Sequence, residues 1–182
     1  MTERNARVLL LGLDTDSEKG QALREILAEM DVEAVPISPA WKKEKVGDLA
    51  EGCFPDWPEE AEAAEEEFLL MSGLTDGQLD RFLKEMGKKN VRVAYKAVLT
   101  EHNRNWTLEA LLKEIAQEHR YFAAVQSLQQ AIRFAEAFPR QAKKPKAKQT
   151  LQEAKRLLQS QTDNIKAYED VARQLRQAWG QE

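Results

Sequence analysis

The chain has 182 residues, of which 27 are basic and 31 acidic, so its formal net charge is −4. This balance does not favour general nucleic-acid binding, which needs an excess of positive charge to neutralise phosphates. Hydrophobic residues make up 42% of the chain, enough for a core, while 32% charged residues with few Gly and Pro indicate long exposed helices. The length fits one domain, or one domain with an appendage.

The sequence also limits the compartment and the chemistry. No apolar run approaches the length that spans a bilayer, and residues 1–5 lead into a strand rather than a signal peptide. We therefore expect a cytoplasmic protein without a membrane partner. The single cysteine, Cys53, excludes an internal disulfide bond and a cysteine-cluster metal site, and we expect no metal and no cofactor.

The first part of the chain, residues 6–50, has the pattern strand, helix, strand, short helix. Residues 8–11 (VLLL) form an apolar run typical of a strand buried on both faces. A second strand is predicted over 32–37 and a short helix over 41–49. The helix between the two strands is indicated by apolar residues at helical spacing, namely Leu23, Ile26, Leu27 and Met30.

The opening VLLLGLDTD resembles that of a response-regulator receiver domain, in which acidic residues after the first strand bind magnesium. Asp14 and Asp16 would be those residues. The resemblance ends there, because Ser72 stands where a receiver domain needs a phosphoacceptor aspartate. We therefore interpret Asp14 and Asp16 as caps of the helix that follows.

A connector of different composition comes next. Residues 52–58 (GCFPDWP) predict a turn-rich loop, and residues 59–67 are strongly acidic. The acidic stretch either attracts a cationic partner or is a solvated start of a helix, and its Glu and Ala content favours the second interpretation.

Residues 66–115 repeat the pattern of the first part more clearly. A buried strand over 68–71 is followed by a helix, indicated by Leu79, Phe82, Leu83 and Met86 at helical spacing, and by a second strand over 91–99. Two strands joined by a short helix form a parallel pair with a right-handed crossover. Asn105 or Thr107 would cap the next helix.

The two halves, 6–50 and 66–120, resemble each other down to Gly20-Gln21 and Gly77-Gln78. The predicted fold class is therefore α/β: a duplicated βαβα unit forms a small four-stranded, mainly parallel sheet over residues 1–120. A C-terminal α-helical hairpin is predicted over 121–182.

Residues 66–120 also resemble a small bacterial family known only as a domain of unknown function. The resemblance rests on SGLT at 72–75, KAVLT at 96–100 and NWTL at 105–108. It supports the boundary of the domain and the importance of the loop after the last strand. It carries no activity, substrate or catalytic residue to this chain.

This loop is the candidate ligand site. It follows a parallel strand and precedes a helix, a place where α/β sheets bind ligands and where free backbone N–H groups favour anions. Asn and Thr are equally common as capping residues, and a tryptophan here could simply fasten the helix to the sheet. The candidate residues are Lys96, Thr100, His102, Asn103, Arg104, Asn105, Trp106 and Thr107.

The last third of the chain is helical. Residues 107–138 contain no Gly or Pro, so we expect a helix that either breaks near 119–121 or extends beyond the sheet. A basic turn with two prolines spans 139–148, and no aromatic residues accompany its lysines. A last helix over 148–179 has apolar residues in heptad positions and either packs as one seam on 122–135 or splits at Thr162-Asp163-Asn164.

Two functions follow from these patterns. The leading hypothesis is a non-enzymatic interaction or regulatory module that binds itself or another protein through the C-terminal helices. The candidate contact residues are Leu151, Leu158, Ile165, Tyr168, Leu175 and Trp179. The alternative is a binder of a small anionic ligand, or an enzyme acting on one, at the 100–107 loop. No Cys-His pair or Ser-His-Asp spacing is present, so no catalytic residue is assigned.

Overall fold

The computed structural model describes residues 6–59, 63–139, 142 and 146–180. The chain forms two compact units, Met1–Ile115 and Ala116–Glu182, which are described separately below. We call them the α/β unit and the helical unit. The domain boundary at 120 predicted from the sequence stays a prediction.

The α/β unit contains one four-stranded sheet. Its strands are β1 (Arg7–Leu11), β2 (Glu33–Pro36), β3 (Phe68–Ser72) and β4 (Tyr95–Val98), in the order β2-β1-β3-β4. The pairs β1–β2 and β3–β4 are parallel, whereas the central pair β1–β3 is antiparallel, with Arg7 opposite Ser72 and Leu11 opposite Phe68. The four-stranded, mainly parallel sheet is thus confirmed.

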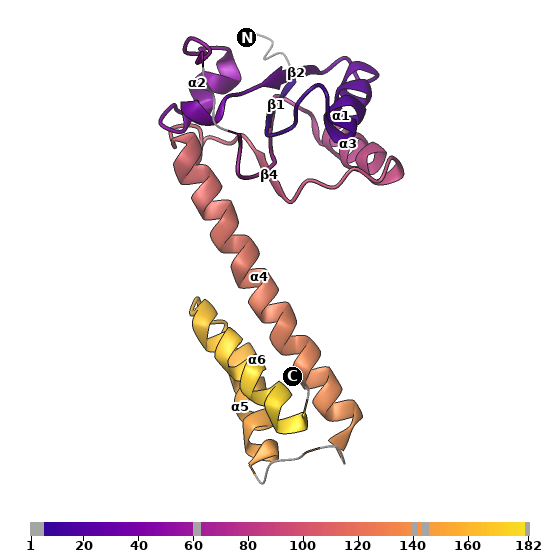
Figure 1. The fold of residues 1–182 in the computed structure, drawn as a ribbon, viewed down its shortest axis with the longest axis vertical. Helices are drawn as coiled ribbons and strands as arrows, with labels where there is room; N and C mark the ends of the chain where they lie inside the picture. Colours follow the sequence, from indigo (N-terminus) through magenta and orange to yellow (C-terminus); the bar gives the residue numbers. More distant parts are fainter. Residues whose placement is uncertain (1–5, 60–62, 140–141, 143–145, 181–182) are drawn as a thin grey trace. The chain divides into compact units, whose positions relative to one another are not determined.

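Both faces of the sheet are covered by helices. Successive side chains of β1 point to opposite faces, so Val8 and Leu10 belong to one core cluster and Leu9 and Leu11 to another. The first cluster lies under α1 (Glu18–Ala28) and α3 (Asp76–Lys88), which Figure 1 shows side by side. The second lies under α2 (Val46–Glu51) and the first turns of α4 (Leu108–Ala137).

The helix boundaries follow from local chemistry. Ser17 caps α1 by accepting a hydrogen bond from Gly20 N at 3.0 Å, and Thr75 forms a capping box with Gln78 at the start of α3. The prediction that Asp14 and Asp16 cap α1 is therefore wrong. Asp14 contributes its backbone carbonyl instead, which accepts from the Ser17 hydroxyl at 2.9 Å.

The two halves end their first helices in the same way. Asp31 and Asn90 both have positive φ, 56° and 53°. The next residue in each half donates its backbone N–H to a carbonyl five residues earlier, Val32 to Leu27 at 2.9 Å and Val91 to Met86 at 2.8 Å. These features agree with a duplicated unit, which stays a prediction.

Two elements differ from their predicted extent. The strand expected over 91–99 is β4 at Tyr95–Val98, because the chain from Val91 first closes the end of α3 and only then pairs with β3. The helix expected over 41–49 is a 3-10 turn, η1 (Pro39–Trp41), followed by α2. Ser38 caps the turn by accepting from Ala40 N at 3.2 Å.

The helical unit contains the second part of α4 with α5 (Ala147–Ser160) and α6 (Ile165–Trp179). α4 continues without a break through 119–121. The helix expected over 148–179 is split, because Gln161 adopts the left-handed conformation (φ 49°) and Asn164 caps α6 by accepting from Ala167 N at 3.1 Å. Half of the basic turn predicted over 139–148, residues 140, 141 and 143–145, lies outside the described residues.

Small side chains let the helices of this unit approach closely. Larger residues also join α4 and α6: Tyr121 and Tyr168 stack edge to face at 5.7 Å, and Arg176 donates to the Ser127 hydroxyl at 2.6 Å. Residue numbers increase along both helices from the first contact to the second, so α4 and α6 run parallel. The buried alanines are Ala124, Ala131, Ala135, Ala147, Ala154, Ala172 and Ala178.

No helix in the described part of the chain is both long and apolar enough to cross a membrane.

The hydroxyl of Tyr168 gives a pH test of the helical unit. Burial, reinforced by a hydrogen bond with Tyr121, raises the pKa of Tyr168 above its ordinary value. The unfolded chain then loses this proton first, so the stabilisation is complete below about pH 10 and is lost as pH rises through the folded pKa. We expect Tyr168→Phe to flatten the fall in unfolding free energy between about pH 9 and 11, measured by urea denaturation. An unchanged slope in the variant would contradict this assignment.

Candidate functional site

The candidate loop 100–107 lies against the segment before α2. Val46 N donates to Trp106 O, and Leu108 N donates to Glu44 O, both at 2.9 Å. Lys45 and Thr107, the residues just before α2 and α4, form an antiparallel bridge between these contacts. Each helix therefore starts on the loop that precedes the other, and we call this arrangement the helix-start junction.

A second pair of hydrogen bonds extends the junction. Gly47 N donates to Arg104 O, and Glu109 N donates to Lys42 O, again both at 2.9 Å. A Cβ at Gly47 would lie 2.6 Å from Arg104 O, so the contact requires glycine. The junction thus depends on a close backbone approach that no other residue type permits.

The junction uses the donors on which the anion-site prediction depended. The first backbone N–H groups of α4, those of Leu108 and Glu109, donate to carbonyls of the 42–44 segment. The next, Ala110 N, donates to the Thr107 hydroxyl at 3.2 Å, which makes Thr107 the side-chain cap of α4. An anion at this helix start would have to displace bonds within the protein.

Thr100 and Asn103 form a closed turn at the end of β4. The Asn103 side-chain oxygen accepts from Thr100 N at 2.8 Å, and its amide nitrogen donates to Val98 O at 3.0 Å. Asn103 N in turn donates to the Thr100 hydroxyl at 3.3 Å. These side chains stabilise the turn and cover part of an edge strand.

Arg104 joins two elements through ion pairs. Its guanidinium contacts Glu101 Oε1 at 3.1 Å and Glu51 Oε1, from the last residue of α2, at 2.5 Å. The hydrogen bond and charge of Glu101, followed by the charge of Glu51, raise the pKa of Arg104. Because the pairs are near the surface, they hold the loop in place more than they stabilise the fold.

The remaining candidate residues surround this turn. Lys96 donates to the carbonyl of Val93, the His102 ring stacks edge to face on Trp106 at 5.2 Å, and Asn105 is exposed. Trp106 is half-buried against the core cluster that contains α2 and α4. A hollow of about 250 Å³ does occur beside the loop, lined by Leu99, Thr100, Glu101 and Arg104.

The candidate contact residues of the C-terminal helices lie in or against the core of the helical unit. Tyr168, Leu175 and Trp179 are buried, and the Trp179 indole donates to Phe138 O at 2.9 Å. Leu151, Leu158 and Ile165 are half-buried against the same cluster. This placement does not leave the three buried side chains available to a partner.

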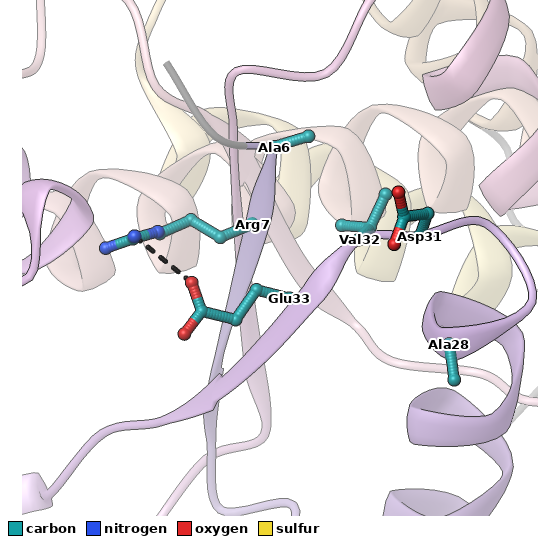
Figure 2. Close-up of a pocket in the computed structure, with 6 residues that line it drawn as sticks. All are labelled: Ala6, Arg7, Ala28, Asp31, Val32 and Glu33. Atoms are coloured by element: carbon teal, nitrogen blue, oxygen red, sulfur yellow. Dashed lines mark ion pairs between the residues drawn. The ribbon is translucent and has the colours of Figure 1, made fainter. Parts of the chain in front are cut away.

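A hollow of about 740 Å³ lies at the amino ends of β1 and β2. Figure 2 shows Arg7 and Glu33 pointing toward each other, with a Nη2–Oε2 distance of 3.1 Å, while Asp31 and Ala28 lie on the other side of the hollow. The Arg7 guanidinium is therefore neutralised by Glu33.

A larger cleft, about 810 Å³, lies at the carboxyl ends of the same two strands. Its lining comes from several separate parts of the chain: Leu10, residues 12–17, Arg24, Pro36, Ile37, Pro39, Trp57, Ala63 and Ala64. This cleft was not predicted from the sequence, although the polar run after the first strand and Trp57 in the turn-rich loop were both visible there. Among the described residues, no three His, Cys, Asp or Glu side chains are grouped to hold a metal ion.

Comparison with known proteins shows that part of the chain is similar to a known family. Residues 67–122 match the family described as Domain of unknown function (DUF3783). This match confirms the resemblance detected over residues 66–120, and it covers the second half of the sheet together with the candidate loop. No curated protein and no solved structure gave a significant match to the chain.

Substitution of Gly47 tests the helix-start junction. We expect Gly47→Ala to destabilise the protein by about 1–3 kcal/mol, because the new methyl group would overlap the Arg104 carbonyl. Gly87→Ala is the matched control: its Cβ would meet nothing within 4 Å in α3, so a gain of about 0.5–1 kcal/mol is expected. Urea unfolding of both variants measures the difference. Equal effects of the two substitutions would mean that the junction does not constrain residue 47.

Proposed function

We propose that this protein is a non-enzymatic interaction module whose helical unit contacts a partner protein through α4. The observation that carries the proposal is the exposure of Phe122, which at 61% is the highest among the large apolar side chains of the described residues. Single exposed apolar residues are ordinary on protein surfaces. Phe122 differs from such single residues because neighbouring aromatic side chains support its ring.

Phe122 lies next to a fixed aromatic pair. Its ring is edge to face with Tyr121 at 5.7 Å, and Tyr121 is in turn edge to face with the buried Tyr168 at 5.7 Å. A ring supported in this way loses little conformational freedom when a partner covers it. Aromatic anchors of this kind contribute much of the binding energy in protein interfaces.

Polar side chains lie on the same face of α4 as this anchor. Glu118 and Gln126, about one helical turn before and after Phe122, are both exposed. An apolar centre with an exposed polar rim is the usual composition of a non-obligate interface. The proposal therefore moves the contact surface from the seam of α5 and α6 to the outer face of α4.

Site-specific photocrosslinking tests this surface. We expect the full chain carrying p-benzoylphenylalanine at position 122 to give a discrete crosslinked species in its native cells. The matched control carries the same amino acid at Leu83, an apolar residue of α3 that is 41% exposed, and should not give that species. A crosslinked mass near twice 20.8 kDa would identify a second copy as the partner. No crosslinked species, or the same species from both positions, would refute the proposal.

The alternative function, an anionic ligand at the 100–107 loop, has less support. The hollow beside the loop is small, and the Arg104 guanidinium and the amides that start α4 already have partners within the protein. We expect inorganic phosphate to show the same weak affinity for the wild type and for Arg104→Ala and Asn105→Ala in isothermal titration. A clear loss of affinity in either folded variant would instead favour the ligand function.

A further inference from the structure

The cleft of about 810 Å³ occupies a place where α/β sheets bind ligands. β1 is followed by α1 on one face of the sheet, whereas β2 is followed by η1 and α2, which belong to the other face. The two connections separate at the carboxyl ends of β1 and β2, so a crevice opens between them. Its volume is in the range of small-molecule sites.

One wall of the cleft is apolar and held in place. Trp57, which is 56% exposed, forms this wall beside Pro39 and Ile37. Its indole is edge to face with the buried Trp41 at 5.1 Å, and Trp41 stacks on Phe54 at 5.6 Å. Trp57 is thus supported by Trp41, lines the cleft and remains partly exposed.

The rest of the lining includes polar side chains, and its acidic groups outnumber its one basic group. Asp14 and Asp16 are exposed, and within the described part of the chain neither carboxylate has an ion-pair partner. Arg24 also lines the cleft, and its Nη1 donates to Leu13 O and Gly20 O at 3.0 Å each. These neutral carbonyls orient the guanidinium but do not cancel its charge, so Asp14, Asp16 and Arg24 together carry a net charge of −1. Ser17 is occupied as the cap of α1.

We propose that this cleft binds a small organic cation, an ammonium group carried on an apolar or aromatic body. The two carboxylates would hold the ammonium group, and its body would lie against Ile37, Pro39 and the face of Trp57, where a cation is also attracted by the indole ring. Two carboxylates without a third protein ligand among the described residues are too few for a dedicated divalent metal site. An anion would face two carboxylates and one guanidinium, so the net negative charge of the lining disfavours it.

The test uses phenethylammonium as the probe and the full chain as the receptor. We expect a Kd of about 1 mM, as is typical for a ligand of this size, and weaker binding at high salt. Phenylpropionate, which has the same ring and the opposite charge, should not bind. NMR titration of the tryptophan indole signals would place the probe, because the Trp57 signal should move and the Trp106 signal should not.

Two sets of variants connect the binding to the cleft. The isosteric pair Asp14→Asn and Asp16→Asn, introduced together, should weaken binding about tenfold, and Trp57→Ala about fivefold. The matched control, Asp76→Asn with Asp80→Asn, removes the same charge from the surface of α3 and should leave the Kd unchanged. Phe122→Ser should also leave it unchanged, which separates this site from the proposed interaction surface.

Three results would overturn the proposal. The first is that phenethylammonium does not bind at concentrations up to about 10 mM, at which a site of this affinity would be mostly filled. The second is that phenylpropionate binds as tightly as phenethylammonium or more tightly. The third is that the aspartate variants keep the wild-type Kd while their unfolding curves match that of the wild type.

Discussion

The α/β unit depends on two adjacent strands, β1 and β3, that are buried on both faces. All five residues of β3 and four of the five in β1 are buried, and the two strands pair antiparallel along their whole length. A fully buried leucine side chain contributes about 1.5–3 kcal/mol of hydrophobic stabilisation, so these two strands hold a large share of the core. Neither strand is stable without helices on both sides, which is why each half must supply one helix to each face.

The antiparallel centre also explains the helix-start junction. Because the two βαβ segments run in opposite directions, the chains that follow β2 and β4 cross to the same face from opposite ends. There α2 and α4 begin beside each other and exchange four backbone hydrogen bonds through residues 42–47 and 104–109. The polar loop after β4 therefore has a structural role. This role explains why the loop contains Asn, Thr and Arg side chains, and no ligand is needed to explain them.

The two halves differ at the carboxyl ends of their parallel strands. In the second half, the turn of Thr100 and Asn103 occupies that end, and only a small hollow remains. In the first half, the chain turns away at Pro39 and leaves a cleft lined by Asp14, Asp16 and Trp57. The matched family segment, 67–122, covers the filled half, so the cleft lies in the part of the chain outside that match.

Much of the architecture could be predicted from the sequence because it depends on local chemistry. The apolar runs of β1 and β3, the helical spacing of Leu23 to Met30, the possible split near Asn164 and the cap at Thr107 each involve residues close together in the chain. The split shows how a local signal decides between two alternatives. The heptad pattern of apolar residues continues across 161–164, but the helix itself is interrupted there because Asn164 caps a new helix.

The tertiary structure decided what depends on residues far apart in sequence. The order and direction of β1 and β3 follow from packing two βαβ segments together, and no local signal distinguishes an antiparallel centre from a parallel one. The same packing brings Gly47 against Arg104, uses the amides of α4 that an anion would need, and places Trp57, Asp14 and Asp16 in the lining of one cleft. In the helical unit, packing among α4, α5 and α6 buries Tyr168, Leu175 and Trp179. The sequence could not decide this, because a heptad pattern indicates that a face is covered but not which element covers it.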